Sequence, residues 1–200
     1  ELPGELPEMQ SVLDVSAFAE AQNTDLTEGR IVVSGTVNFM ILYLDKMGDP
    51  ASLDAKCDFK HSIPNSDAAP GMNALSRVKT GEISCQPQGS RSVAMRCEIK
   101  LDVFAWQSTS SEILDPNMTE DGLETRVQTQ KLTRLISGRS AKSFVRSEVR
   151  ISQSMPPAQN ILLARGHVSL ASATPEDGKI ALEGEMKVFI VYQSRDSNAP

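Results

Sequence analysis

The sequence predicts an all-β protein built from tandem antiparallel domains of sandwich-like or barrel-like form. Three observations lead to this class. Apolar and polar residues alternate through several long stretches, clusters of Gly, Pro, Asn and Asp separate those stretches, and one strand pattern occurs twice. Alternation is the period of a half-buried strand, and turn residues at regular spacing are typical of all-β domains.

The repeated pattern occupies residues 29–43 (GRIVVSGTVNFMILY) and residues 178–192 (GKIALEGEMKVFIVY), at an offset of 149 residues. Identical residues are Gly29/Gly178, Ile31/Ile180, Gly35/Gly184, Ile41/Ile190 and Tyr43/Tyr192. The alternating apolar residues are Ile31, Val33, Val37, Phe39, Ile41 and Tyr43 in the first copy, and Ile180, Leu182, Met186, Val188, Ile190 and Tyr192 in the second. A period of two puts each set on one strand face, so we expect a core face in both copies. The opposite face, with Ser34, Thr36 and Asn38 or with Glu183, Glu185 and Lys187, is expected to be solvated near the start of each strand.

The repeat extends upstream at the same offset, from residues 6–17 to residues 155–166. Pro7/Pro156, Gln10/Gln159 and Leu13/Leu162 are identical there. In each copy a strand, near 12–23 or 161–173, precedes a turn closed by glycine, which accepts a positive φ. Each copy therefore opens with a long antiparallel hairpin. Solenoid units are only about 20 to 50 residues long, so the repeat predicts two tandem domains.

We place the first domain at residues 1–110, a linker at 111–122 and a partial second domain at 123–200. After its hairpin the first domain is expected to continue with a turn (45–52), a strand (53–63), a loop (65–72) and two strands (74–85 and 92–106). Residues 144–151 alternate and predict a strand leading into the second copy. Residues 123–143 fit either one strand with a loop or a short helix at 128–136.

The second copy has no counterpart of residues 54–106. Its hairpin is therefore followed by nothing in this sequence that would cover its apolar face, and an isolated hairpin is marginal in water. The sequence is either a fragment or is completed by another chain. We expect the second hairpin to pack onto the first domain or to be completed by strands from a neighbouring chain.

The composition argues against nucleic acid and anionic membranes as partners, since the net charge is −6 and the pI is near 5.0. No apolar run is long enough for a membrane span, and no charged-then-apolar leader is visible. The expected partners are other protein chains, including further copies of this one as a homo-oligomer.

The three cysteines, Cys57, Cys85 and Cys97, form no CxxC pair and have no zinc-ligand spacing. Each lies at an apolar position of its expected strand, which favours buried free thiols acting as small hydrophobic side chains. The alternative is a disulfide between Cys85 and Cys97 across a hairpin whose turn lies near 88–91.

No constellation of residues predicts catalysis, a cofactor or a metal. The two histidines, His61 and His167, lie in different copies at places that do not correspond. Residues 115–122 match a calcium loop poorly, since the glycine falls too late and no closing glutamate follows, so a solvated linker is the better interpretation. The aspartates Asp45, Asp49, Asp54 and Asp58 are expected to be turn and edge charges, and the glycosylation sequon at 117–119 is short enough to arise by chance.

The sequence also resembles a known family, the SPOCS domain of SipL-type spore-coat morphogenetic proteins. The residues that carry the resemblance are 29–43, then Phe59, Ile63, Pro64, Gly71 and Met72, then 91–105. It covers about residues 6–106 and recurs over 144–192. Members of the family are similar in carrying tandem copies, sometimes with a peptidoglycan-binding LysM module, which is not visible here. The resemblance implies an assembly or adaptor protein at the developing spore surface, without catalytic residues.

Two functions are therefore expected ahead of any enzyme. The first is a structural module that joins proteins in a spore coat or similar envelope layer, assembled from the mother-cell cytoplasm. The second is a subunit of an extracellular or spore-surface fibre in which β-strands pair between chains.

Overall fold

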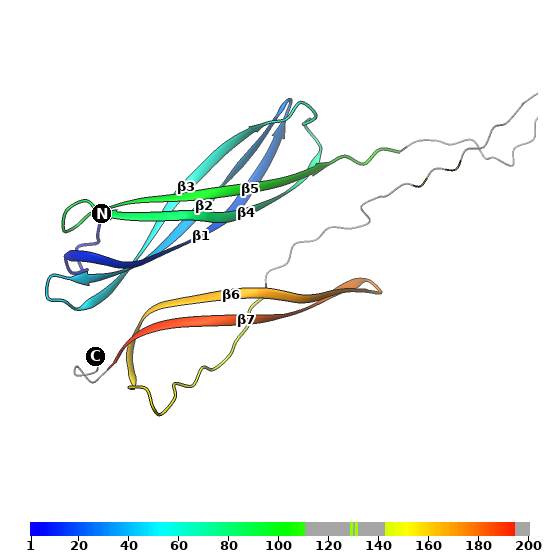
Figure 1. The fold of residues 1–200 in the computed structure, drawn as a ribbon. Helices are drawn as coiled ribbons and strands as arrows, with labels where there is room; N and C mark the ends of the chain where they lie inside the picture. Colours follow the sequence, from blue (N-terminus) through cyan, green and yellow to red (C-terminus); the bar gives the residue numbers. More distant parts are fainter. Residues whose placement is uncertain (111–128, 130, 132–142, 195–200) are drawn as a thin grey trace, which may run out of the picture. The chain divides into compact units, whose positions relative to one another are not determined.

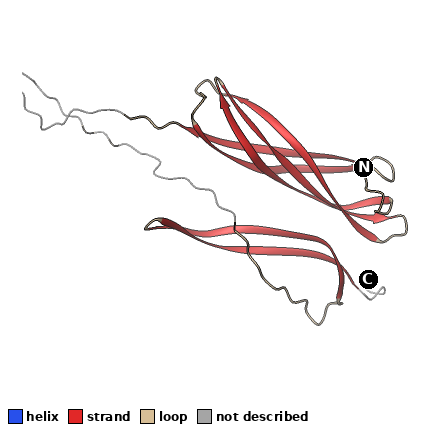
Figure 2. Ribbon diagram, turned by 180° about the vertical axis from the view of Figure 1, so that it is seen from behind, coloured by secondary structure: helices blue, strands red, loops and turns tan. Residues whose placement is uncertain are grey.

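The computed structural model describes residues 1–110, 129, 131 and 143–194, which contain strands and loops (Figures 1 and 2). The strands are β1 (Met9–Thr27), β2 (Arg30–Asp45), β3 (Pro50–Pro64), β4 (Asn73–Pro87), β5 (Val93–Trp106), β6 (Ala158–Glu176) and β7 (Lys179–Ser194). All pairings between them are antiparallel. The predicted all-β class is confirmed.

Strands β1 to β5 form two layers. One layer is the sheet β1–β2–β3 and the other is the hairpin β4–β5, which crosses over the β1–β2 face in Figure 1. The expected strand order along the chain is correct, and the turn between β4 and β5 lies where it was predicted. A hydrogen bond from Gln88 N–H to the Ser92 carbonyl, at 2.7 Å, closes this turn. The layering is sandwich-like, as the sequence indicated.

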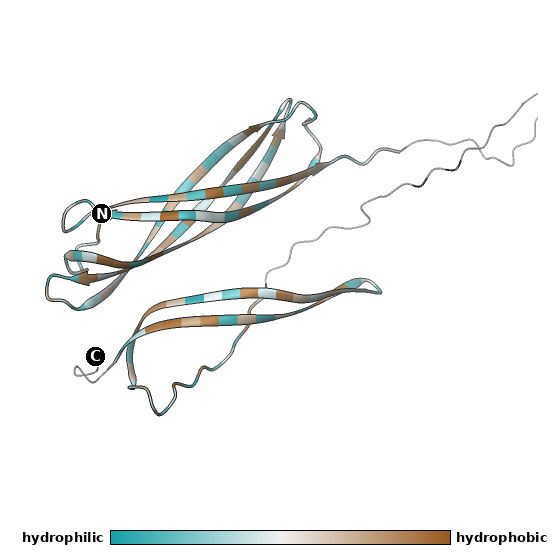
Figure 3. Cartoon of the chain, viewed as in Figure 1, coloured by the Kyte–Doolittle hydropathy of each residue, from teal (hydrophilic) through white to brown (hydrophobic). Residues whose placement is uncertain are grey.

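The core of these five strands lies between the layers. Its centre is the predicted apolar face of β2, where Ile31, Val33, Val37, Phe39, Ile41 and Tyr43 are at most 6% exposed. Alternate apolar residues of β4 and β5 pack against them, and Figure 3 shows the resulting alternation of hydropathy along the strands. The hydroxyl of Tyr43 keeps a partner inside the core, since it donates a hydrogen bond to the Pro7 carbonyl at 3.1 Å.

The turns owe their shape to glycine and to local hydrogen bonds. Gly29 adopts φ +70° between β1 and β2, as expected. Its N–H donates to the Ala68 carbonyl at 2.9 Å, and its carbonyl accepts from Asn65 N–H at 3.1 Å. The loop after β3 therefore ties down the β1–β2 turn. At the other end, the carboxylate of Asp45 accepts the N–H groups of Met47 and Asp49, which makes Asp45 a turn-forming residue.

Gly35 permits a close approach inside the sheet. A Cβ at this position would collide with the Glu20 carbonyl of β1 and lie 2.8 Å from the ring of Phe59 on β3. In the second copy, a Cβ on Gly184 would lie 2.5 Å from the Ser169 carbonyl, the equivalent of Glu20. The identity of these two glycines in the repeat therefore has a steric cause.

The β6–β7 hairpin repeats the register of β1–β2 throughout. β1 has three irregularities, after Met9, Val12 and Ala21. β6 has them after Ala158, Ile161 and Leu170, which are the same three places in the repeat. Tyr192 likewise donates to the Pro156 carbonyl, at 3.0 Å. The predicted second hairpin is thus present, with its backbone geometry preserved in detail.

Three expectations need correction or lie outside the described residues. Residues 144–151 do not form the predicted strand, because no described segment hydrogen-bonds to them, and Phe144 is 93% exposed. Thr36 is not solvated but 8% exposed, since it accepts a hydrogen bond from Gln22 and donates one to Asp58. The linker at 111–122 and nearly all of 123–143 lie outside the description.

Candidate interaction site

The residues weighed for catalysis and metal binding do not converge. His61 on β3 and His167 on β6 are both exposed, and they pair across their sheets with Val33 and Lys187. No group of three metal-ligating side chains occurs within the described ranges. The calcium-like segment 115–122 and the sequon at 117–119 lie outside these ranges.

The cysteines are free thiols in the described structure, and none of them is fully buried: Cys85 and Cys97 are half-buried and Cys57 is exposed. Cys85 pairs with Met95 and Cys97 pairs with Ile83, so the β4–β5 register does not place the two thiols opposite each other for the alternative disulfide. Burial raises the pKa of both, and the neighbouring Glu98 adds to the rise at Cys97. Cys57 lies on the same face of the sheet as its partner Val37, but on the edge strand β3, whereas β4 packs against β1. The expectation of burial is therefore wrong for Cys57.

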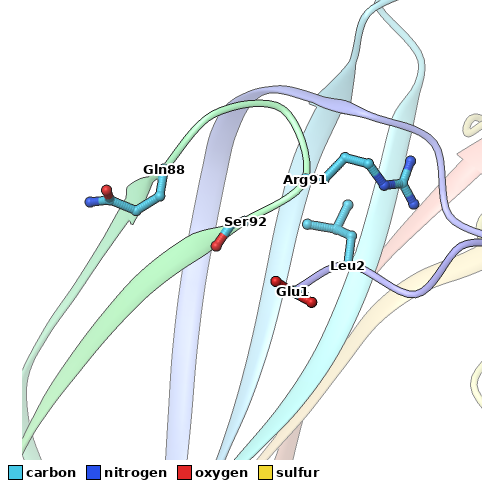
Figure 4. Close-up of a pocket in the computed structure, with 5 residues that line it drawn as sticks. All are labelled: Glu1, Leu2, Gln88, Arg91 and Ser92. Atoms are coloured by element: carbon cyan, nitrogen blue, oxygen red, sulfur yellow. The ribbon is translucent and has the colours of Figure 1, made fainter.

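A hollow of about 320 Å³ lies where the N-terminal segment meets the β4–β5 turn (Figure 4). Its lining residues are Glu1, Leu2, Gln88, Arg91 and Ser92. The Arg91 guanidinium is already engaged, because it donates to the carbonyls of Pro3 at 2.8 Å and Leu6 at 3.3 Å. Leu2 is 6% exposed and belongs to the core. The hollow is therefore part of the packing contact between the N-terminal segment and the β4–β5 turn.

The outer edge of the three-stranded sheet is β3, which hydrogen-bonds to β2 alone among the described strands. Exposed charges of both signs alternate along it, at Asp54, Lys56, Asp58 and Lys60. Charged side chains on an edge strand oppose indiscriminate pairing with a strand from another chain. This edge is thus a poor template for unselective strand addition.

The most extensive candidate surface is on the second hairpin. Its members, which we call the β6–β7 apolar face, are Val168, Leu170, Ile180, Leu182, Met186 and Val188, with exposed fractions between 38% and 69%. Cross-strand pairing places them together, since Val168 lies opposite Met186 and alternate residues of β7 share a face. Contiguous exposed apolar side chains typically mark a protein interaction surface.

The first copy shows what these positions do when they are covered. Their equivalents are Ala19, Ala21, Ile31, Val33, Val37 and Phe39. All six belong to, or pack against, the core clusters beneath β4–β5. The sequence predicted a core face in both copies, and the structure confirms it only in the first.

No helix of the described residues has the length and hydropathy that crossing a membrane requires. In a comparison with known families, residues 8–88 match the model described as SipL, SPOCS domain. The matched segment runs from the start of β1 to the turn after β4. No curated protein and no solved structure matches the chain significantly.

Proposed function

We propose that this protein is a non-enzymatic module that joins proteins in a coat or similar envelope layer. The basis is the match of residues 8–88 to the SipL SPOCS domain family, which suggests a role related to sporulation or the spore coat. It acts through protein-protein contacts made by its β-strands. It assembles from the mother-cell cytoplasm onto the developing spore surface. The single observation that carries the proposal is the β6–β7 apolar face. Its side chains are exposed, whereas the equivalent side chains of the β1–β2 hairpin are packed beneath β4–β5.

The chemistry of the described residues supports a role without catalysis. A general base needs a histidine or carboxylate within hydrogen-bond reach of a nucleophile and usually a cleft around them. His61 and His167 are exposed on separate hairpins. The carboxylate of Asp45 is occupied by the N–H groups of its own turn.

The alternative function is a subunit of an extracellular or spore-surface fibre with strands paired between chains. One observation favours it. Residues 143–152 have no secondary structure, yet Val145, Val149 and Ile151 expose apolar side chains at odd-numbered positions, which would suit a strand added to a neighbour. The charged β3 edge weighs against it, because charged side chains along an edge strand discourage such pairing.

A fluorescent fusion of the whole protein in sporulating cells tests the two functions. The coat module is expected to form a shell around the developing spore, and Leu182→Lys is expected to disperse it while Ser169→Lys, on the opposite face of the hairpin, does not. Diffuse fluorescence of the unmodified protein throughout sporulation contradicts the coat proposal. The fibre function would be established instead by filaments outside the spore that survive detergent alone and dissociate when a thiol reductant is added.

A further inference from the structure

The two hairpins share an apolar patch on the side opposite to the core-type face. On this outer side each copy is polar near the start of its second strand, at Ser34 or Glu183, and becomes apolar near the end of that strand. Cross-strand pairing groups Asp14, Ser16, Met40 and Leu42 in the first copy, and Leu163, Arg165, Phe189 and Val191 in the second. We call these two groups the first and the second outer strip. Because they are equivalent in the repeat, each hairpin has an apolar surface on both of its sides.

The two outer strips differ in charge. In the first strip the charged residues paired directly with the apolar ones are acidic, namely Asp14 of β1 and Asp54 of β3. In the second strip the charged residue is basic, since Arg165 pairs with Phe189 and its guanidinium lies 5.8 Å from the centre of that ring. The two strips are therefore complementary to each other, whereas two copies of either strip would bring like charges together.

Two leucines indicate that the outer strips are covered. Leu42 is 7% exposed and Leu163 is 3% exposed, yet neither belongs to the core clusters beneath β4–β5. A side chain on the face of a two-stranded hairpin reaches such low exposure only when residues from outside the hairpin cover it. The carboxylate of Asp14 and the guanidinium of Arg165 form an ion pair, and residues 1–107 and 151–200 belong to one compact unit. The charges beside the two buried leucines therefore pair with each other.

We propose that the second outer strip docks on the first outer strip of the same chain, on the side of the β1–β2–β3 sheet away from β4–β5. This contact goes beyond the coat function proposed above and does not depend on it. Residues 107–157 join β5 to β6, so the contact is intramolecular and is favoured over the same contact between two chains. The β6–β7 apolar face lies on the other side of the hairpin, so docking leaves that face accessible to a partner.

The test is hydroxyl-radical footprinting of the full 200-residue chain, read by mass spectrometry at individual leucines. Leucines of the chain itself supply the standards, since Leu53 in the core is 6% exposed and Leu170 is 61% exposed. Leu42 and Leu163 are expected to react as slowly as Leu53, at about a tenth of the rate of Leu170, in proportion to the exposed fractions. Sedimentation velocity is expected to show a monomer at every concentration used.

Charge reversal tests whether the two strips recognise each other. Arg165→Glu places a second carboxylate against Asp14, and like charges at a contact oppose it. The rates at Leu42 and Leu163 are then expected to rise several-fold toward that of Leu170, while Leu53 stays slow. Asp14→Lys combined with Arg165→Glu restores opposite charges and is expected to restore the slow rates. Arg96→Glu makes the same reversal on the exposed side of β5 and is expected to change none of the rates.

Four outcomes would overturn the proposal. Rates at Leu42 and Leu163 close to that of Leu170 in the unmodified chain would do so directly. Slow rates that Arg165→Glu leaves unchanged, or fast rates that the double variant fails to reverse, would show that the charges do not select the contact. Slow rates that appear only where sedimentation shows a dimer would mean that the strips pair between two chains. None of these results depends on where the protein localises in cells, so the coat proposal is judged separately by the fusion experiment.

Discussion

A matched pair of isoleucines offers the sharpest test of the difference between the two hairpins. Ile31 and Ile180 occupy equivalent positions, but Ile31 is 3% exposed and Ile180 is 62% exposed. Replacing either by alanine removes three carbon atoms, worth about 2.4 kcal/mol of transfer free energy when fully buried. At Ile31 the cavity left behind adds to this, so Ile31→Ala is expected to lower the free energy of unfolding by about 3 to 4 kcal/mol. For Ile180→Ala the exposed fraction reduces the expected loss to about 1 kcal/mol or less.

The single tryptophan makes the measurement specific to the first copy. Trp106 is at the end of β5, so its fluorescence reports the unfolding of the β1–β5 layers. With a urea m-value of about 2 kcal/mol/M, Ile31→Ala is expected to lower the midpoint by about 1.5 M. Ile180→Ala is expected to leave that midpoint nearly unchanged. Equal shifts for the two variants, or a shift below about 0.5 M for Ile31→Ala at this m-value, would refute the argument from burial.

Three further predictions concern the thiols, the core tyrosine and the central glycine. Cys57, the exposed thiol, should react first with an alkylating reagent, and Cys57→Ser should remove the fast phase seen by mass spectrometry, whereas a remaining fast phase would contradict the assignment. Tyr43→Phe should cost about 1 kcal/mol in urea unfolding through its lost hydrogen bond. Burial, and secondarily the nearby Asp45, raise the pKa of Tyr43. The stabilisation by the protonated hydroxyl should therefore be complete below pH 10 and be lost as the pH rises through the pKa of the folded protein. Above that pH, the difference in unfolding free energy between wild type and Tyr43→Phe should become smaller. Gly35→Ala should cost about 1 to 3 kcal/mol through its collision with the Glu20 carbonyl, and an unchanged urea midpoint would disprove that close contact.

The sequence predicted β2 far better than β1, and bulges are the reason. β2 has no irregularity against β3 and keeps a strict period of two, which is why its core face was identified residue by residue. In β1 the inward residues step by three at each bulge, from Met9 to Val12 and from Val12 to Val15. A bulge changes which face the following residues occupy, so the alternation is broken in the sequence. The repeat nevertheless marked two of these places, because Gln10 and Leu13 are identical in both copies.

The candidate site was only partly predictable for a different reason. Alternation shows that Ile180 and Leu182 share a face, but it does not show whether another layer covers that face. Burial depends on strands distant in the sequence, and the alternation within one strand carries no information about them. The exposure of Cys57 was missed for the same reason, since its alternation matches that of buried neighbours while β4 packs toward the β1 side of the sheet.

The shared bulges have a consequence for how fast and how tightly a cover can associate. A bulge bends its strand and increases the local twist. Since the same three bulges occur in the covered hairpin β1–β2 and in the exposed hairpin β6–β7, the bend is a property of the hairpin and does not depend on its cover. A hairpin already curved to its bound shape loses little conformational entropy when a partner arrives. The hairpin would then bind nearly as a rigid body, and the loss of conformational entropy on binding would come from the partner alone.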